Sequence, residues 1–215
     1  MAERLESCAA VDRIKRWANH PIQVDRVAMV RGLILAAAAL VALSVAHAAD
    51  LEGVSMSDAR VVNGTQMRLN GIGLRTFSVL GVRIYVAGLY LERPNDNAEA
   101  IIHSPDTKLL DIRFLRNVDA QDARKAWQES LEQNCRAPCH LDSNDEQRFL
   151  AAVPSVRRGD ASTLLFTARS VHITLNGQAL GDILDRPFAG LMLATFIGPE
   201  PPTPRLKRQL LGLRD

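Results

Sequence analysis

Apolar and polar residues alternate in a series of short segments after residue 58, and this spacing predicts β-strands joined by tight turns. Two Asn-Gly pairs, Asn63-Gly64 and Asn176-Gly177, stand between such segments and predict β-hairpins, because these residues tolerate the positive φ of a two-residue turn. Gly71-Ile72-Gly73 interrupts the pattern, and Pro94 ends its first part. The predicted strands lie within 60–70, 74–79, 82–91, 108–115, 163–168, 171–175 and 178–180.

Helical spacing of apolar residues marks the middle and the end of the chain. It runs from Asp119, a candidate N-cap, to Gln133. Pro187 fits the first position of a later helix. The other predicted helices cover 97–103, 142–152, 187–197 and 204–211. Runs of antiparallel strand with helices grouped between them predict an α+β domain, and the lack of strict strand-helix alternation argues against a parallel sheet.

One stretch near the N-terminus is much more apolar than the rest. Residues 32–46 carry no charge, follow Arg31 and end in Ala-His-Ala at 46–48. This pattern is typical of a secretory signal peptide, and the run is shorter than the about 20 residues of a membrane-spanning helix. We predict a signal peptide at 29–48, cleaved between Ala48 and Ala49, and a periplasmic location. A buried core helix is the alternative.

Residues 1–28 are too long and too mixed in charge for the start of a signal peptide. We predict that translation starts at Met29 and that 1–28 are an upstream artefact of the gene model. A signal anchor with a cytoplasmic leader is the alternative. Residues 49–215 then form a single domain of 167 residues, a size that suits one hydrophobic core.

The composition is that of a globular protein. With 47% hydrophobic and 23% charged residues, the chain is neither disordered nor collagen-like. Removal of residues 1–48 takes away six basic and four acidic residues, so that the formal net charge of +2 falls to zero. A neutral domain with few aromatic residues is a poor polyanion binder, and we expect no nucleic-acid partner. We also expect no stable membrane span after signal removal.

Cys135 and Cys139 form an even pair in the exported domain, and an oxidising compartment favours a disulfide between them. With His140 they make the pattern C-x-x-x-C-H, one residue longer than the haem-attachment motif. Zinc would need further ligands, and none has supporting spacing. We therefore expect a disulfide, no metal and no cofactor.

The common catalytic motifs are absent from the sequence. There is no G-x-S-x-G, H-E-x-x-H or P-loop, and Gly71-Ile72-Gly73 lacks the third glycine of a dinucleotide site. The acidic residues near Asp142 lack the glycine and the length of a calcium loop. His172 lies in an apolar strand, where a hydrogen-bonded structural role is expected.

Arg75 and Tyr85 stand out in the most apolar part of the predicted sheet. Both are five residues from Leu80, so a hairpin that turns near Leu80-Gly81 places them opposite each other. A guanidinium binds a carboxylate through two hydrogen bonds, and a phenol supplies one more donor. The pair could hold a small anionic head group. Surface decoration is the alternative.

Two segments resemble the chalcone isomerase-like family. LNGIGLRTFSVLGVRIYVAGLYLE, residues 69–92, resembles its G-x-G-[VIL]-R turn and GVYLE-like strand, and GDILDRPFAGLMLATFIGPEPPTPRLKRQLLG, residues 181–212, resembles its final helices. LLDIRFLRNVDAQDARKAWQESLEQNC is similar to the central crossover of the family more loosely. The likeness is greatest to the exported bacterial branch. It implies an open-faced sandwich, in which a large antiparallel sheet is covered on one side by helices, with a ligand cleft between.

The family includes isomerases that close a flavanone ring and relatives that bind fatty acids. By this resemblance, Arg75 matches the arginine that anchors an anionic oxygen. Tyr85 replaces an isomerase threonine, and an Arg and a Tyr hold the carboxylate in the fatty-acid-binding relatives. The isomerase Tyr, Asn and Thr/Ser positions fall on Ala120, Trp127 and Ala189, which cannot make the same hydrogen bonds.

These observations favour a periplasmic protein that binds an apolar, fatty-acid-like carboxylate at Arg75 and Tyr85. An isomerase (intramolecular lyase) acting on a chalcone-like enone is the first alternative, with Arg75 stabilising an oxyanion and Tyr85 orienting a nucleophile or acting as general acid. A non-catalytic structural or partner-binding envelope protein is the second.

Overall fold

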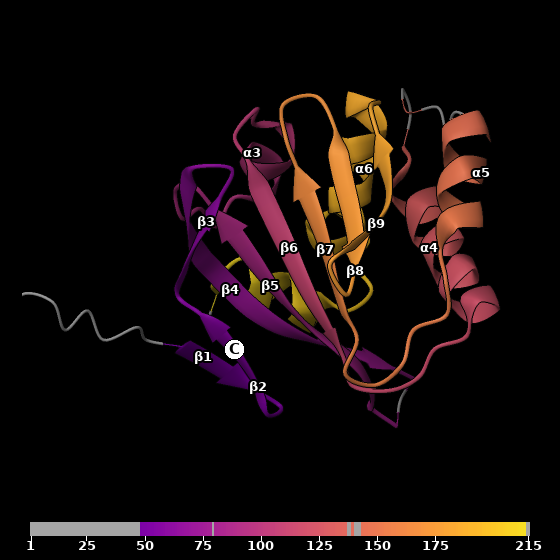
Figure 1. Cartoon of the computed structure of the whole chain (residues 1–215), viewed down its shortest axis with the longest axis horizontal. Coiled ribbons are helices and arrows are strands. Elements are labelled where there is room, and N and C mark those ends of the chain that lie inside the picture. The colour runs from indigo at the N-terminus through magenta and orange to yellow at the C-terminus, as the bar shows by residue number, and fades with distance from the viewer. Residues whose placement is uncertain (1–47, 79, 137–138, 140–142, 214–215) are drawn as a thin grey trace, which may run out of the picture. The chain divides into compact units, whose positions relative to one another are not determined.

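The computed structural model describes residues 48–213 except 79, 137–138 and 140–142. The predicted leader and most of the predicted signal peptide, up to residue 47, lie outside the described residues, as do His140 and Asp142. In the described part, seven antiparallel strands form one sheet in the order of the chain, two more strands form a separate hairpin, and five helices follow or separate them (Figure 1). The predicted α+β class is confirmed.

The sheet contains β3 (Ala59–Val62), β4 (Thr65–Phe77), β5 (Val82–Leu91), β6 (Lys108–Phe114), β7 (Ala161–Phe166), β8 (Val171–Leu175) and β9 (Gln178–Ile183). The separate hairpin consists of β1 (Ala48–Leu51) and β2 (Val54–Ser57). The helices are α3 (Ala98–His103), α4 (Ala120–Asn134), α5 (Ser143–Ala152), α6 (Arg186–Ile197) and α7 (Pro204–Leu210).

Local sequence signals account for most of these boundaries. Asn63 and Gly64 adopt φ values of 49° and 79° between β3 and β4, and Asn176-Gly177 turns in the same way between β8 and β9. The side chains of Asn97, Asp185 and Thr203 accept hydrogen bonds from backbone amides at the starts of α3, α6 and α7. The predicted hairpins and helices are therefore present.

Gly71-Ile72-Gly73 does not interrupt the strand, contrary to the prediction. Strand β4 continues through these residues with a register shift between Leu69 and Gly71. The glycines are needed because α7 crosses the strand here: a Cβ on Gly71 would lie 2.0 Å from the carbonyl oxygen of Gln209. A second, smaller correction concerns α6, in which Pro187 is the second residue and not the first.

The β1–β2 hairpin was not predicted. Its turn is Glu52-Gly53, with φ values of 54° and 76°, and Glu52 is a less usual residue at positive φ than asparagine. Met56 of β2 packs in a small buried cluster with Leu74 and Val86 of the main sheet. The hairpin therefore covers part of one sheet face.

The other sheet face carries all five helices. The main core contains inward-facing residues of β5, β6 and β7 together with residues from α3, α4, α5, α6 and α7. In Figure 1, α6 and α7 are seen behind the sheet. A single layer of helices on one face of an antiparallel sheet is the predicted open-faced sandwich, and this prediction is confirmed.

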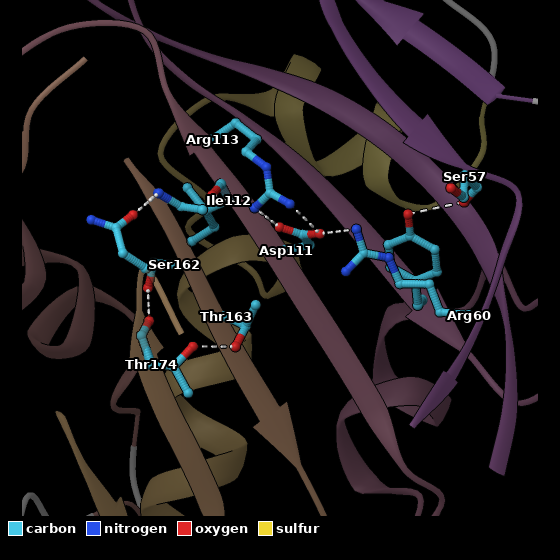
Figure 2. A network of polar contacts seen from close by, with 11 residues as sticks. Ser57, Arg60, Asp111, Ile112, Arg113, Ser162, Thr163 and Thr174 are labelled. Atoms are coloured by element: carbon cyan, nitrogen blue, oxygen red, sulfur yellow. Dashed lines mark hydrogen bonds and ion pairs between the residues drawn. The ribbon is translucent and has the colours of Figure 1, made fainter. Parts of the chain in front are cut away.

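A polar network lies on the face away from the helices (Figure 2). Asp111 is fully buried and forms ion pairs with Arg60, at 2.5 Å, and with Arg113. Arg60 comes from the edge strand β3 and passes 5.0 Å from the centre of the Tyr90 ring on the way to Asp111 of β6. Burial raises the pKa of Asp111, and the two arginines oppose that shift. The Arg60–Asp111 ion pair links the edge strand β3 to β6, on the sheet face opposite the helices.

Candidate functional site

A cavity of about 1140 Å³ lies between the sheet and helices α4, α5 and α6. It is slightly larger than the range of roughly 300–1,000 Å³ typical of small-molecule pockets. Much of its wall is apolar, and includes Ile112, Trp127, Phe149, Leu164, Ile173 and Phe196. The ring of Trp127 contacts the rings of Phe149 and Phe196 edge to face, with centroid distances of 4.9 and 5.6 Å. Such a wall suits an apolar ligand.

Arg75 and Tyr85 are paired across β4 and β5, as predicted, and both side chains line this cavity. A register shift lies directly after Arg75, between Arg75 and Thr76. Two polar side chains from neighbouring strands are thus brought to the same place on an otherwise apolar wall.

The guanidinium of Arg75 is held by backbone carbonyls. Its Nη1 donates to the carbonyl oxygen of Thr76 at 2.8 Å and to that of Pro202 at 2.7 Å. Among the described residues, no carboxylate pairs with Arg75, and its Nε and Nη2 have no protein acceptor. Burial lowers the pKa of Arg75, with Tyr85 opposing the shift, but arginine stays charged in proteins. Arg75 therefore presents an uncompensated positive charge.

Tyr85 presents a neutral hydroxyl beside this charge. Its ring packs against Phe114 and Phe196, with centroid distances of 6.0 and 6.5 Å. Burial raises the pKa of Tyr85 to about 12, and Arg75 lowers it by a smaller amount. At neutral pH the phenol is therefore a hydrogen-bond donor, and no acceptor meets it within the described part of the chain. The two neighbours together offer donors to an anionic oxygen.

The three isomerase positions do not restore a catalytic site. Trp127 lines the cavity, whereas Ala120 lies outside the lining and Ala189 is buried in the core. Thr195 of α6 does line the cavity, but its hydroxyl already donates to the carbonyl oxygen of Met192 at 2.7 Å. Two of the three positions are alanines without a hydrogen-bonding side chain, and the indole N–H of Trp127 can donate but cannot accept a hydrogen bond.

Two residues of the site were missed by sequence reasoning. Thr195 and Pro202 line the cavity, and Pro202 holds Arg75 through its backbone carbonyl. Every residue has a backbone carbonyl, so the residue type does not show which one accepts a hydrogen bond, and no motif could have identified Pro202. For Thr195, the helical spacing of 187–197 was the available signal, because a small polar residue interrupts an apolar helix.

The remaining predicted sites have structural roles. Cys135 and Cys139 form a disulfide after the end of α4, which confirms the predicted pair. His172 contacts Ser170 Oγ at 3.0 Å and Asp182 Oδ1 at 2.6 Å, the hydrogen-bonded role expected for it. The described residues contain no cluster of side chains that could hold a metal ion, and none of their helices is long and apolar enough to cross a membrane.

An antiparallel sheet, one layer of helices and an apolar cavity between them define an α+β open-faced sandwich. The family model described as chalcone isomerase-like matches residues 48–212, and the chain belongs to this family. A crystal structure of a fatty-acid binding protein from Arabidopsis thaliana is similar, with a TM-score of 0.64 and 16% sequence identity, over 77% of this chain and 96% of that chain. This likeness shows a common fold. No curated protein sequence matches the chain.

Proposed function

We propose that the domain binds an apolar carboxylate, such as a fatty acid, in the cavity. The carboxylate accepts hydrogen bonds from Arg75 and Tyr85, and the hydrocarbon chain packs among the rings of Trp127, Phe149 and Phe196. The observation that carries this proposal is the pair of unpartnered donors on an apolar wall.

The expected energetics fit this class of ligand. Burial contributes about 0.8 kcal/mol for each methylene, so the hydrocarbon chain supplies most of the affinity. A hydrogen bond to a charged group contributes about 1.5–3 kcal/mol, which is enough to fix the orientation of the head group. The similar Arabidopsis protein is described as a fatty-acid binding protein, which supports the same class.

Tryptophan fluorescence provides a direct test. The chain has two tryptophans, Trp17 and Trp127, and only Trp127 belongs to the domain. Titration with palmitate should change Trp127 emission, and Arg75→Ala should weaken binding about 10- to 100-fold, the equivalent of one charged hydrogen bond. Arg83→Ala is the matched control, because Arg83 is exposed and lies outside the cavity wall.

A neutral ligand sharpens the test. Wild-type protein should prefer palmitate to the alcohol of the same chain length, whereas Arg75→Ala should bind the two about equally. The proposal is wrong if palmitate does not bind, or if Arg75→Ala keeps both the affinity and the preference of the wild type.

The geometry gives less support to the two alternatives. An isomerase would need hydrogen-bonding groups where Ala120, Trp127 and Ala189 stand, so chalcone absorbance should decay in its presence at the uncatalysed rate. A purely structural envelope protein would be expected to have a closed core beside Arg75, but Arg75 lines a large cavity.

We also propose that the domain works in the periplasm after removal of the signal peptide. The disulfide between Cys135 and Cys139 supports an oxidising compartment. The family match begins at residue 48, beside the proposed cleavage site, which supports a signal peptide separate from the domain.

A further inference from the structure

The β4–β5 hairpin ends in an exposed apolar tip, formed by Phe77 and Leu80. Their exposed fractions are 62% and 86%, and Leu80 is the most exposed large hydrophobic residue in the described part of the chain. At the base of the tip Phe77 pairs with Val82, and Gly81 N donates to Ser78 O at 3.1 Å. Two large apolar side chains exposed next to each other are candidates for a contact surface.

This apolar tip adjoins the proposed ligand site. Phe77 and Val82 both line the cavity, and Phe77 follows Arg75 by two residues on the same strand. The apolar surface therefore continues from the cavity wall to the solvent-exposed end of the hairpin. A ligand that enters beside Arg75 passes close to this tip.

Four exposed arginines surround the same end of the sheet, and we call them the basic rim: Arg83, Arg116, Arg157 and Arg158. They come from adjacent segments, since Leu115 N donates to Ile84 O at 2.9 Å and Gly159 N donates to Phe114 O at 2.8 Å.

Acidic groups also lie among these arginines. Glu52 pairs with Arg83 at 2.6 Å, and Asp160 accepts a hydrogen bond from the backbone amide of Arg157 at 2.7 Å. Asp119 lies at the start of α4, close to the same end. Asp122, in the first turn of α4, is a fourth acidic residue near this end, so the four arginines are balanced in number. Arg116 and Arg158 have no ion-pair partner among the described residues and remain available to an anionic surface.

We propose that this end of the domain docks on the surface of a lipid bilayer that contains anionic lipids. Phe77 and Leu80 insert at the boundary between head groups and acyl chains, and the basic rim lies against the lipid phosphates. In this orientation the ligand passes between the bilayer and the cavity beside Arg75. The ligand's identity rests on the proposed function, but the docking does not.

Vesicle sedimentation tests the docking. Vesicles of phosphatidylcholine with phosphatidylglycerol should bind the purified chain more strongly than pure phosphatidylcholine, and salt should weaken this binding. The double variant Phe77→Ser/Leu80→Ser should bind about tenfold less or weaker still, because it loses two large inserted side chains. Val61→Ser is the matched control, since Val61 is 74% exposed on the edge strand β3.

Because all variants carry residues 32–46, any contribution of that apolar segment is the same in each. The docking proposal is overturned if wild-type protein does not bind the vesicles, if the double variant binds like wild type, or if Val61→Ser weakens binding as much as the double variant does. The double variant Arg157→Gln/Arg158→Gln should make vesicle binding less sensitive to salt. If the salt sensitivity is unchanged, the basic rim does not contact the lipid phosphates.

A transfer assay separates this proposal from the proposed function. Transfer of a fluorescent fatty acid from wild-type protein should become faster as vesicle concentration rises, because exchange happens on contact. The single variant Leu80→Ser, which changes a residue outside the cavity wall, should keep its equilibrium affinity for palmitate and transfer more slowly. A rate independent of vesicle concentration contradicts exchange on contact. If the protein binds no fatty acid, the proposed function fails, while sedimentation still decides the docking.

Discussion

At the scale of single residues, the case for an anion site depends on the environments of Arg75 and Tyr85. Neither set of free donors is sealed from solvent, since no buried side-chain nitrogen or oxygen of the described residues lacks a hydrogen-bond partner. Here both line a cavity, and an anionic oxygen is the group that would satisfy them together. Arg60 and Arg113 on the opposite sheet face differ from Arg75, because both form ion pairs with Asp111.

The pKa of Tyr85 leads to a prediction that needs no ligand. The chain has two tyrosines, Tyr85 and Tyr90, and burial raises the pKa of both, that of Tyr85 to about 12. An alkaline titration followed by ultraviolet absorbance should therefore show Tyr85 ionising only near pH 12 while the protein is folded, with the pKa of Tyr90 also above its ordinary value. Tyr85→Phe should remove one of the two late transitions.

The same shift fixes the direction of a stability change. The unfolded chain releases its tyrosine protons near pH 10, whereas the folded chain keeps that of Tyr85 up to about 12. The folded state thus binds more protons in this window, and its free energy of unfolding falls as pH rises from 10 to about 12. Urea unfolding at several pH values measures this, with Tyr85→Phe as the control. Ionisation of Tyr85 near pH 10 in folded protein would contradict its buried environment.

At the scale of elements, the packing of α7 on β4 positions the site. Gly71 and Gly73 let the helix backbone approach the strand, and Leu74 N donates to the Gln209 side chain at 3.0 Å. Arg75 is the next residue, and the loop before α7 supplies its Pro202 acceptor. The strand, the loop and the helix therefore hold Arg75 as one unit.

Gly71→Ala should disturb this unit. Its Cβ would lie 2.0 Å from a backbone oxygen, so α7 must move, at a cost of about 1–3 kcal/mol in unfolding free energy. Gly190→Ala in α6 is the control: its nearest contact is an ordinary 3.8 Å, and alanine favours a helix. Denaturant unfolding of both variants checks this. A Gly71→Ala protein as stable as wild type would show that α7 does not pack closely on β4.

The sequence predicted local features better than contacts between distant segments. Asn-Gly turns, alternating strands and helix caps depend on neighbouring residues, so they could be found without the fold. The role of Gly71 and the acceptor at Pro202 come from α7 and the loop before it, which lie more than a hundred residues further along the chain. Such contacts cannot be obtained from spacing.

The Arg75–Tyr85 pair was predicted correctly, but its register depends on a detail of the strand that the sequence does not show. The turn itself pairs Phe77 with Val82, and counting outward from this pair would place Arg75 opposite Ile84. An irregularity at Ile84 adds one residue to β5 and brings Tyr85 into place. Counting from Leu80 gave the right partner, but the bulge that makes it right has no clear signal in the sequence.

At the scale of the whole molecule, the proposals assign different roles to different parts of the chain. The cavity and its two donors belong to the helix face of the sheet, whereas the Asp111 network and the β1–β2 hairpin stabilise the opposite face. The exposed tip and the basic rim lie at one end of the sheet, beside the cavity. A carrier that exchanges ligand at a membrane needs this separation, because the docking surface must leave the binding site intact.

The proposed export leads to a prediction about the mature chain. Cleavage between Ala48 and Ala49 removes only the first residue of β1 and keeps the pairing of Ala49 with Met56, so the domain should fold unchanged. Intact mass of protein from the periplasm should match residues 49–215, and reduction should add the mass of two hydrogen atoms for the disulfide between Cys135 and Cys139. Retention of residues before Met29 would contradict the start site, and two free thiols would contradict the oxidising compartment. A cytoplasmic protein with an uncleaved segment 29–48 would contradict the proposed export. It would not affect the proposed carboxylate site, which the Arg75→Ala titration tests separately.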